Sequence, residues 1–232
     1  MKDCLAIVKR IGYGAARRLR LIPPSVELIT RANTRDAYDL LYSRDDLLKG
    51  YLDPSRLEFY QEVAGYCSEI SCARIVDLGC GTGHLLQAID ARMRSGGRQA
   101  ELYGMDHSQA AVLRASTLLK SGKFLVGDIL ATGYETGFFD LVLSTETFEH
   151  LLRPDLALVE ATRICRAGGA VVLTVPNGDL DTWEGHVNFW NAERFAAFLT
   201  QNSSLEVVRL LTIAQGQALL AHLAKIPTAA AM

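Results

Sequence analysis

The feature that most restricts the fold of this chain is the run IVDLGCGTGHLL at residues 75–86. Its apolar start predicts a strand, its three glycines predict a tight turn, and its end predicts the first turn of a helix. Gly79, Gly81 and Gly83 have no Cβ and accept a positive φ, so a ligand can lie directly on the peptide planes. Asp77, at the end of the strand, faces the same pocket. The run therefore predicts a strand–turn–helix unit that binds an adenosine-bearing cofactor.

The spacing of these glycines separates two classes of cofactor. The dinucleotide fingerprint is Gly-x-Gly-x-x-Gly, and its third glycine position is occupied here by His84 or Leu86, depending on where the count starts. This spacing disfavours a nicotinamide-dependent oxidoreductase. The observed pattern, Asp-x-Gly-x-Gly-x-Gly, resembles the first motif of class I S-adenosylmethionine-dependent methyltransferases. An ordinary strand-to-helix turn is the alternative for a bare Gly-x-Gly-x-Gly.

The resemblance implies a binding site for S-adenosylmethionine in this turn. The methionine part of the cofactor would lie on the turn, where its amino and carboxylate groups find backbone partners and a nearby acid. The residues that the resemblance places there are Asp77, Gly79, Cys80, Gly81 and Gly83.

Strands and helices alternate after the turn, which is typical of a parallel sheet covered on both faces. The predicted strands are residues 75–78, 101–106, 124–129, 138–146, 170–177 and 205–213, and the predicted helices are 84–94, 109–120 and 154–166, with another that Asn191 caps. Residues 217–226 have helical propensity, yet the resemblance implies an antiparallel strand there, and we predict the strand. The implied fold is α/β: a Rossmann-like, mostly parallel sheet of seven strands in the order 3-2-1-4-5-7-6.

Acidic residues end several of these strands and are candidates for holding the cofactor. Asp106 ends the second strand, where an acid can accept hydrogen bonds from both ribose hydroxyls, and it can also cap the helix that starts near Ser108. The resemblance adds His107 beside it. It also implies that Asp128 accepts a hydrogen bond from the adenine amino group while Ile129 packs on the ring; Asp128 as a loop acid is the alternative.

The fourth strand leads to the predicted acceptor side of the pocket. Ser144 and Glu146 end this strand and are candidate cofactor-binding residues; for Glu146 the alternative is that it orders the loop. The Glu-His pair that follows, at residues 149–150, narrows the resemblance to methyltransferases that act on small molecules. No Asn/Asp-Pro-Pro-Tyr/Phe motif is present after the strand, which disfavours the amino-group methyltransferases that act on adenine or glutamine.

Two histidines are candidate general bases. His150 follows the fourth strand, and His186 lies in the segment WEGHVNFW before the last helix. Histidine titrates near neutrality, and a base adds roughly 10²- to 10⁴-fold to the rate when a hydroxyl must lose its proton. The alternative is that each histidine only anchors its loop. We predict methyl transfer to a small-molecule acceptor, at oxygen; a non-catalytic S-adenosylmethionine-binding interaction protein is the alternative function.

The region before the sheet predicts a helical lid. Residues 25–73 carry apolar side chains mostly at spacings of three and four, and Asp53-Pro54 marks a helix start. The resemblance implies that such helices cover the cofactor and shape the acceptor pocket. Tyr38, Tyr42 and Tyr51 are either lid contacts or ordinary core residues.

Composition sets the remaining expectations. The 232 residues fit one α/β domain, divided here into a basic segment (1–24), the lid (25–73) and the methyltransferase domain (74–232). Five cysteines without a paired C-x-x-C spacing predict neither disulfides nor a metal site, which favours the cytoplasm. No apolar stretch reaches the ~20 residues of a membrane span. The basic segment is a solvated helix or a weak peripheral membrane contact, and the net charge of -2 disfavours nucleic acid.

Overall fold

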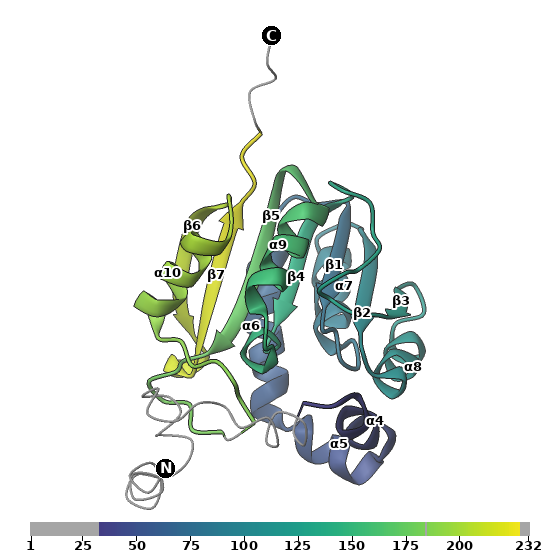
Figure 1. The fold of residues 1–232 in the computed structure, drawn as a ribbon. Helices are drawn as coiled ribbons and strands as arrows, with labels where there is room; N and C mark the ends of the chain where they lie inside the picture. Colours follow the sequence, from purple (N-terminus) through teal and green to yellow (C-terminus); the bar gives the residue numbers. More distant parts are fainter. Residues whose placement is uncertain (1–32, 184, 228–232) are drawn as a thin grey trace, which may run out of the picture.

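A computed structural model describes residues 33–183 and 185–227, which form a seven-stranded sheet with helices on both faces (Figure 1). The sheet order is β3-β2-β1-β4-β5-β7-β6, which confirms the predicted Rossmann-like fold. The strands are β1 (Arg74–Leu78), β2 (Glu101–Asp106), β3 (Lys123–Val126), β4 (Phe139–Thr145), β5 (Cys165–Pro176), β6 (Glu206–Ile213) and β7 (Ala218–Ala224).

Strand direction brings the candidate site residues to one edge. Strands β1 to β5 pair in parallel, so their carboxyl ends lie together at the lower edge in Figure 1, and β7 pairs antiparallel with both β5 and β6. Asp77 lies opposite Gly104 in this register, two residues before Asp106 on the neighbouring strand. Ligands of open parallel sheets bind at this edge.

Alternate strand residues point into two separate hydrophobic cores. Val76 and Val142 point toward α9 (Pro154–Ile164) and α10 (Ala192–Asn202), whereas Ile75 and Leu141 point toward α6 (Pro54–Ser68) and α7 (His84–Ser95). Strands that are buried on both faces require continuous apolar runs, and the sequence supplies them. Helix α8 (Gln109–Leu118) packs on β2 and β3.

Three predicted elements differ in extent or in local preference. The third strand ends at Val126, so Asp128 and Ile129 lie in the turn after it. The fifth strand begins at Cys165, where α9 ends, and is longer than predicted. Residues 218–224 form a strand, as predicted from the resemblance and against their helical propensity, because they pair on both sides with β5 and β6.

The lid consists of α4 (Arg35–Ser43), α5 (Asp45–Tyr51) and α6, and its first two helices lie below the carboxyl edge in Figure 1. Asp53 caps α6 as predicted, since its carboxylate accepts a hydrogen bond from the Arg56 N–H. Asp39 fastens α4 to α8 by accepting hydrogen bonds from the Ser108 hydroxyl and the Ala110 N–H. The basic segment 1–24 and the first part of the lid lie outside the described residues. None of the described helices is long and apolar enough to cross a membrane.

Candidate active site

The glycine turn has the backbone conformation that its sequence predicts. Gly79, Gly81 and Gly83 have φ values of 82°, 50° and 81°. A Cβ on Gly79 would overlap the Thr147 side chain, and a Cβ on Gly83 would come within 3.0 Å of the Ala115 Cβ. Gly79 and Gly81 line the cavity beside Cys80, whereas Gly83 packs on α8 and is not among the cavity-lining residues.

The N–H groups of this turn are already bonded within the protein. Gly79 and Cys80 both donate to the Met105 carbonyl, and Gly81 donates to Asp106 Oδ2 at 2.9 Å. A phosphate-binding turn needs free N–H groups for the anion. This turn therefore offers a close approach to its backbone and an acidic surround, but no anion cradle at these three residues.

Two buried aspartates face the cavity next to the turn. Asp77 is buried, and its Oδ1 has no hydrogen-bond partner. Burial, with a contribution from the negative charge of Asp106, raises the pKa of Asp77 to about 7. Burial also raises the pKa of Asp106, although the hydrogen bonds that it accepts from the Ser108 and Gly81 N–H groups lower this pKa. Ser108, not Asp106, caps α8.

The other predicted cofactor residues divide into two groups. His107, Asp128 and Ile129 line the cavity, with the His107 ring exposed and 5.2 Å from the Tyr38 ring centroid. Ser144 does not reach the cavity lining, because it is fully buried and donates a hydrogen bond to the Leu78 carbonyl at 2.7 Å.

Glu146 stands where β4 ends, with a backbone φ of 51° that is rare outside glycine. Its N–H donates to the Thr174 carbonyl, and the Thr174 hydroxyl donates to its carboxylate at 3.4 Å. Burial raises the pKa of Glu146 to about 7, although the positive charge of Arg56 lowers it. Strain of this kind is concentrated at functional sites.

The two predicted histidines lie together with Glu149 at the far end of the cavity. The His150 and His186 ring centroids are 4.8 Å apart. Burial and the neighbouring His186 lower the pKa of His150 to about 3, so its ring is neutral at pH 7. Glu149 is 1% exposed, and neither of its carboxylate oxygens has a hydrogen-bond partner. The sequence predicts no metal site, yet the structure brings these three potential ligands together.

The lid tyrosines form the outer wall of the same cavity. Tyr38, Tyr42 and Tyr51 line it and also pack on one another, with neighbouring ring centroids 5.9 Å apart. These tyrosines therefore both line the cavity and pack as core residues of the lid. The Tyr38 ring also lies 6.0 Å from the His150 ring, so it spans from the cofactor side to the histidines.

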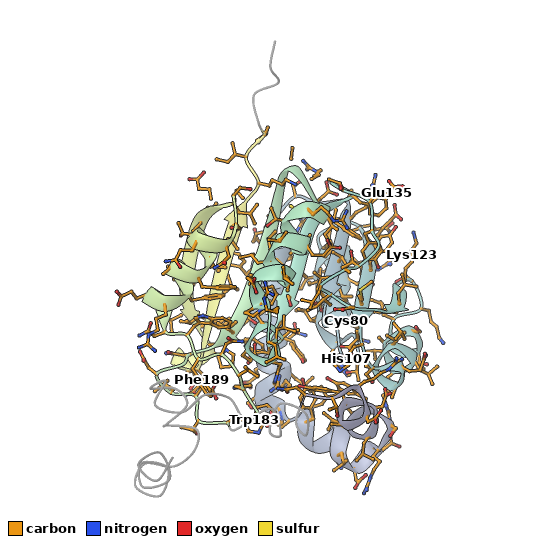
Figure 2. The ribbon with its side chains drawn as sticks, in the orientation of Figure 1. Cys80, His107, Lys123, Glu135, Trp183 and Phe189 are labelled. Atoms are coloured by element: carbon orange, nitrogen blue, oxygen red, sulfur yellow. The ribbon has the colours of Figure 1, made fainter. Side chains whose placement is uncertain are left out.

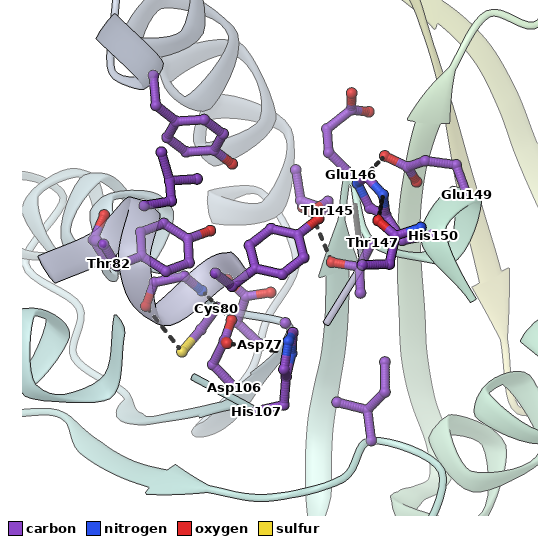
Figure 3. Close-up of a pocket in the computed structure, with 18 of the residues that line it drawn as sticks. Asp77, Cys80, Thr82, Asp106, His107, Thr145, Glu146, Thr147, Glu149 and His150 are labelled. Carbon is purple, nitrogen blue, oxygen red and sulfur yellow. Dashed lines mark hydrogen bonds and ion pairs between the residues drawn. The ribbon is translucent and has the colours of Figure 1, made fainter. Parts of the chain in front are cut away.

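One cavity of about 990 Å³ joins these groups, with the exception of Gly83 and Ser144. In Figure 3, Asp77, Cys80, Asp106 and His107 lie on one side, Glu146, Glu149 and His150 lie on the other, and Thr145 and Thr147 lie between them. Figure 2 places Cys80 and His107 near the ends of β1 and β2, and Trp183 on the loop below β5. This volume is at the upper end of the range for ligand pockets, ~300–1,000 Å³, which suits two ligands held side by side.

Several residues in or directly behind this cavity are not predicted as site residues by the sequence, among them Asn33, Arg56, Glu149 and Asp181. Glu149 enters the sequence motif only as the neighbour of His150. Arg56 lines the cavity, and its pKa is raised overall. Burial lowers this pKa, but the neighbouring Tyr51, Tyr60 and Glu146 raise it by more. The sequence pattern that could have pointed to Arg56 is the Asp53-Pro54 helix start, because Arg56 lies in the first turn of α6. Asn33 bonds to His150, 117 positions away, a separation that no local pattern spans.

Comparison with known proteins indicates a class of domain. Residues 76–173, less than half of the chain, match a family model described as a methyltransferase domain. The sheet order and the glycine turn agree with this match and with S-adenosylmethionine as the cofactor.

Individual relatives agree on the class and differ in their acceptors. The chain is 30% identical over 132 residues to a ubiquinone biosynthesis O-methyltransferase of Nitrosomonas europaea, covering 54% of this chain and 52% of the relative. It is also 30% identical over 103 residues to ajmaline N-methyltransferase of Rauvolfia serpentina, covering 43% of this chain and 34% of that relative. The matches thus span about half or less of the length of these relatives.

Solved structures share the fold at low identity. The N-methyltransferase NodS of Bradyrhizobium japonicum, in complex with S-adenosylhomocysteine, superposes with a TM-score of 0.66 at 21% identity. The superposition covers 84% of this chain and all of that chain. Likeness at this level shows the fold and leaves the acceptor to the site itself.

Proposed function

We propose that this protein transfers the methyl group of S-adenosylmethionine to a hydroxyl oxygen of a small-molecule acceptor. The observation that carries the proposal is the single cavity that joins the glycine turn to the cluster of Glu149, His150 and His186. One end of this cavity suits the cofactor, and the other end holds the polar groups that a hydroxyl acceptor needs.

The cofactor end fits S-adenosylmethionine better than a dinucleotide. Its bonded turn N–H groups leave no seat for a pyrophosphate, while the unpartnered Asp77 Oδ1 is an acceptor for the cofactor's ammonium group. We assign the ribose to Asp106 and His107 and the adenine to Asp128 and Ile129, all of which line the cavity. Gly83 and Ser144 shape this end from behind, without touching the ligand. When bound, the cofactor supplies a sulfonium methyl group that a nucleophile attacks in line.

Oxygen is the favoured acceptor atom because carboxyl and imidazole groups surround the end of the cavity that lies away from the glycine turn. Glu146, Glu149, His150 and His186 present carboxyl and imidazole groups there, which bind a hydroxyl, and His186, paired with Asp181, is the group that we assign to deprotonate it. Alignment of the acceptor supplies much of the rate, since effective molarities in oriented reactions reach about 10⁵–10⁸ M. The lid tyrosines exclude water from the opposite wall. The four described cysteines are free thiols, which fits the reducing cytoplasm that we propose as the compartment.

The first test is calorimetric titration with S-adenosylhomocysteine, which binds without an acceptor. Gly81→Asp should abolish binding, because it puts a charged side chain at a left-handed position that faces the cavity. Gly133→Asp is the matched control: Gly133 also has a positive φ, of 74°, but a Cβ added there would meet no atom within 4 Å, and the residue lies outside the cavity. Absent binding in the wild type, or equal binding in Gly81→Asp, contradicts the proposal.

The second test measures transfer of labelled methyl from the cofactor to a panel of phenols and aliphatic alcohols, with amines included. Hydroxyl acceptors should be methylated, and His186→Ala should lower kcat while S-adenosylhomocysteine still binds. Binding without transfer to any member of a broad panel would instead favour a non-catalytic cofactor-binding protein.

A further inference from the structure

Three side chains of metal-binding type converge at the acceptor end of the cavity. The donor atoms of Glu149, His150 and His186 all lie within 4.8 Å of one another. Nε2 of His150 lies 3.6 Å from Glu149 Oε1, and Nε2 of His186 lies 3.9 Å from the same oxygen. Two histidine nitrogens thus face one carboxylate oxygen.

A neighbouring amide fixes the tautomer of His150. The Asn33 side-chain nitrogen donates to the Gly185 carbonyl at 2.8 Å, so its Oδ1 is turned toward His150 Nδ1 at 3.0 Å and accepts from it. Nδ1 therefore carries the proton of the neutral ring. The lone pair of Nε2 faces Glu149.

His186 has the same arrangement with a carboxylate in place of the amide. Its Nδ1 bonds to Asp181 Oδ2 at 2.6 Å, and its Nε2 faces Glu149. Histidines that ligate metals almost always donate their other N–H to a carboxylate, a carbonyl or another acceptor, which orients the ring and raises its basicity. Both histidines here are oriented in this way.

Glu149 supplies the independent sign that a ligand is needed. Its carboxylate is 1% exposed, and both oxygens lack a hydrogen-bond partner. A buried carboxyl group without a partner is costly unless it is hydrogen-bonded or coordinates a metal. The Glu149 main-chain carbonyl accepts from the Val187 and Asn188 N–H groups, so the loop that carries His186 is tied to the residue it faces.

We propose that Glu149, His150 and His186 bind a divalent transition-metal ion at the acceptor end of the cavity. Two imidazoles and one carboxylate suit zinc, manganese, iron or cobalt better than magnesium or calcium, which favour all-oxygen sets. Metal–ligand distances of ~2.0–2.2 Å put tetrahedral donors about 3.4 Å apart. The two glutamate–histidine separations must therefore close by roughly half an ångström or less, and any wider donor pair by up to about 1.4 Å. Three protein ligands leave a position open to the cavity.

The open position deepens the function proposed above, on which this part rests. A hydroxyl oxygen of the acceptor binds there and becomes more acidic, as a metal-bound water does. Its proton leaves to water, its oxygen forms the bond to the methyl carbon, and the carbon–sulfur bond breaks with its electron pair left on sulfur. His150 and His186 then act as ligands, and neither needs to serve as the general base.

The test uses the untagged full chain, stripped with a chelator and titrated with Co²⁺ by calorimetry and visible absorption. One equivalent of Co²⁺ should bind with an absorption band typical of low coordination number. It should also quench the fluorescence of Trp183, whose ring lies 4.7 Å from that of His186. Glu149→Gln and His186→Ala should lose this binding. Asp181→Asn should weaken it about 10- to 100-fold, because the carboxylate that orients the His186 ring is lost.

His222→Gln is the matched control, since this histidine bonds to Tyr66 on another part of the molecule. It should bind Co²⁺ as the wild type does. S-adenosylhomocysteine is titrated into every variant to show that the fold and the cofactor end are intact. Normal S-adenosylhomocysteine binding without Co²⁺ binding overturns the metal site and leaves the proposed function standing; loss of S-adenosylhomocysteine binding in the wild type overturns the proposed function itself. Co²⁺ binding that survives Glu149→Gln and His186→Ala also overturns the site.

Discussion

At the scale of single residues, Asp77 is where cofactor binding and stability oppose each other. Asp77 lines the cavity beside the glycine turn, and its buried Oδ1 has no hydrogen-bond partner within the described part of the protein. A bound ammonium group would give this oxygen a charge-assisted partner, worth about 1.5–3 kcal/mol. The residue is thus costly to the empty protein and favourable to the complex.

Asp77→Asn should weaken S-adenosylhomocysteine binding about 10- to 100-fold, because the neutral amide loses the charge-assisted bond. Calorimetry measures this directly. Asp90→Asn is the control, since Asp90 pairs with Arg94 on the surface of α7, and its affinity should equal that of the wild type. Equal affinity in Asp77→Asn would remove this residue from the cofactor site.

The sequence identifies the cavity residues of the proposed cofactor side more completely than those of the proposed acceptor side. Asp77, Asp106 and the glycines follow strand ends within one motif order, so topology alone brings them together. Asn33 and Asp181 become candidates only through their contacts with the two histidines, and Glu149 only because its buried carboxyl group lacks hydrogen bonds. Neither property is written in local sequence patterns.

At the scale of elements, the first two lid helices, α4 and α5, are fastened to α8 by few polar contacts, whereas α6 packs into the core. Asp39 on α4 accepts from the Ser108 hydroxyl and the Ala110 N–H, and Arg114 on α8 donates to the Tyr42 carbonyl and to Asp45 at 2.6 Å. Elements held by few polar contacts open locally at lower free energy than the core.

Asp39→Ala should therefore speed hydrogen exchange of the α4 amides about 10-fold or more, with the sheet amides unchanged, because it removes two hydrogen bonds between α4 and α8. Exchange measured by mass spectrometry on peptides of α4 and β4 tests this. Asp36→Ala, an exposed acid in the first turn of the same helix, should have a smaller effect. Uniform acceleration across both peptides would mean that the variant destabilises the whole fold instead.

In strand β7, pairing with neighbouring strands outweighs the helical propensity of the sequence. Residues 217–226 are rich in alanine and leucine, and local preference alone favours a helix. As β7 they form ladders on both sides, with β5 and β6, and Ala221 and Leu223 enter the core. The predicted strand is confirmed because the motif order places it there, whereas the ends of β3 and β5 depend on local geometry that the order does not specify.

At the scale of the whole molecule, the raised pKa of Asp77 makes stability depend on pH. The native state holds this proton up to about pH 7, whereas the unfolded chain releases it near pH ~3.9. Between these values the native state binds more protons, so this residue's contribution is fully present below about pH 4 and is lost as pH rises through 7. Each pKa unit corresponds to about 1.4 kcal/mol.

Asp77→Asn should accordingly make the ligand-free protein more stable than the wild type at about pH 8, by roughly a few kcal/mol, and change it little at about pH 4. Urea unfolding of both proteins across this range measures the difference, with Asp90→Asn as the control that should show no such trend. A difference that is constant with pH would mean that Asp77 is ionised normally in the fold. Ligand at about 100 times its Kd should add about 2.7 kcal/mol to the wild type.

The cavity also has a consequence for how such a protein diversifies. The residues that we propose to face the cofactor come from β1, β2 and the turn after β3, whereas those that we propose to face the acceptor come from the lid, the end of β4 and the loop around His186. Changes in the second group of segments can therefore alter which compound is accepted while the affinity for the shared cofactor is preserved. A chimaera that exchanges residues 178–190 with those of a related chain should therefore take on the acceptor specificity of that chain. Its cofactor site, which supplies the activated methyl group, would be unchanged.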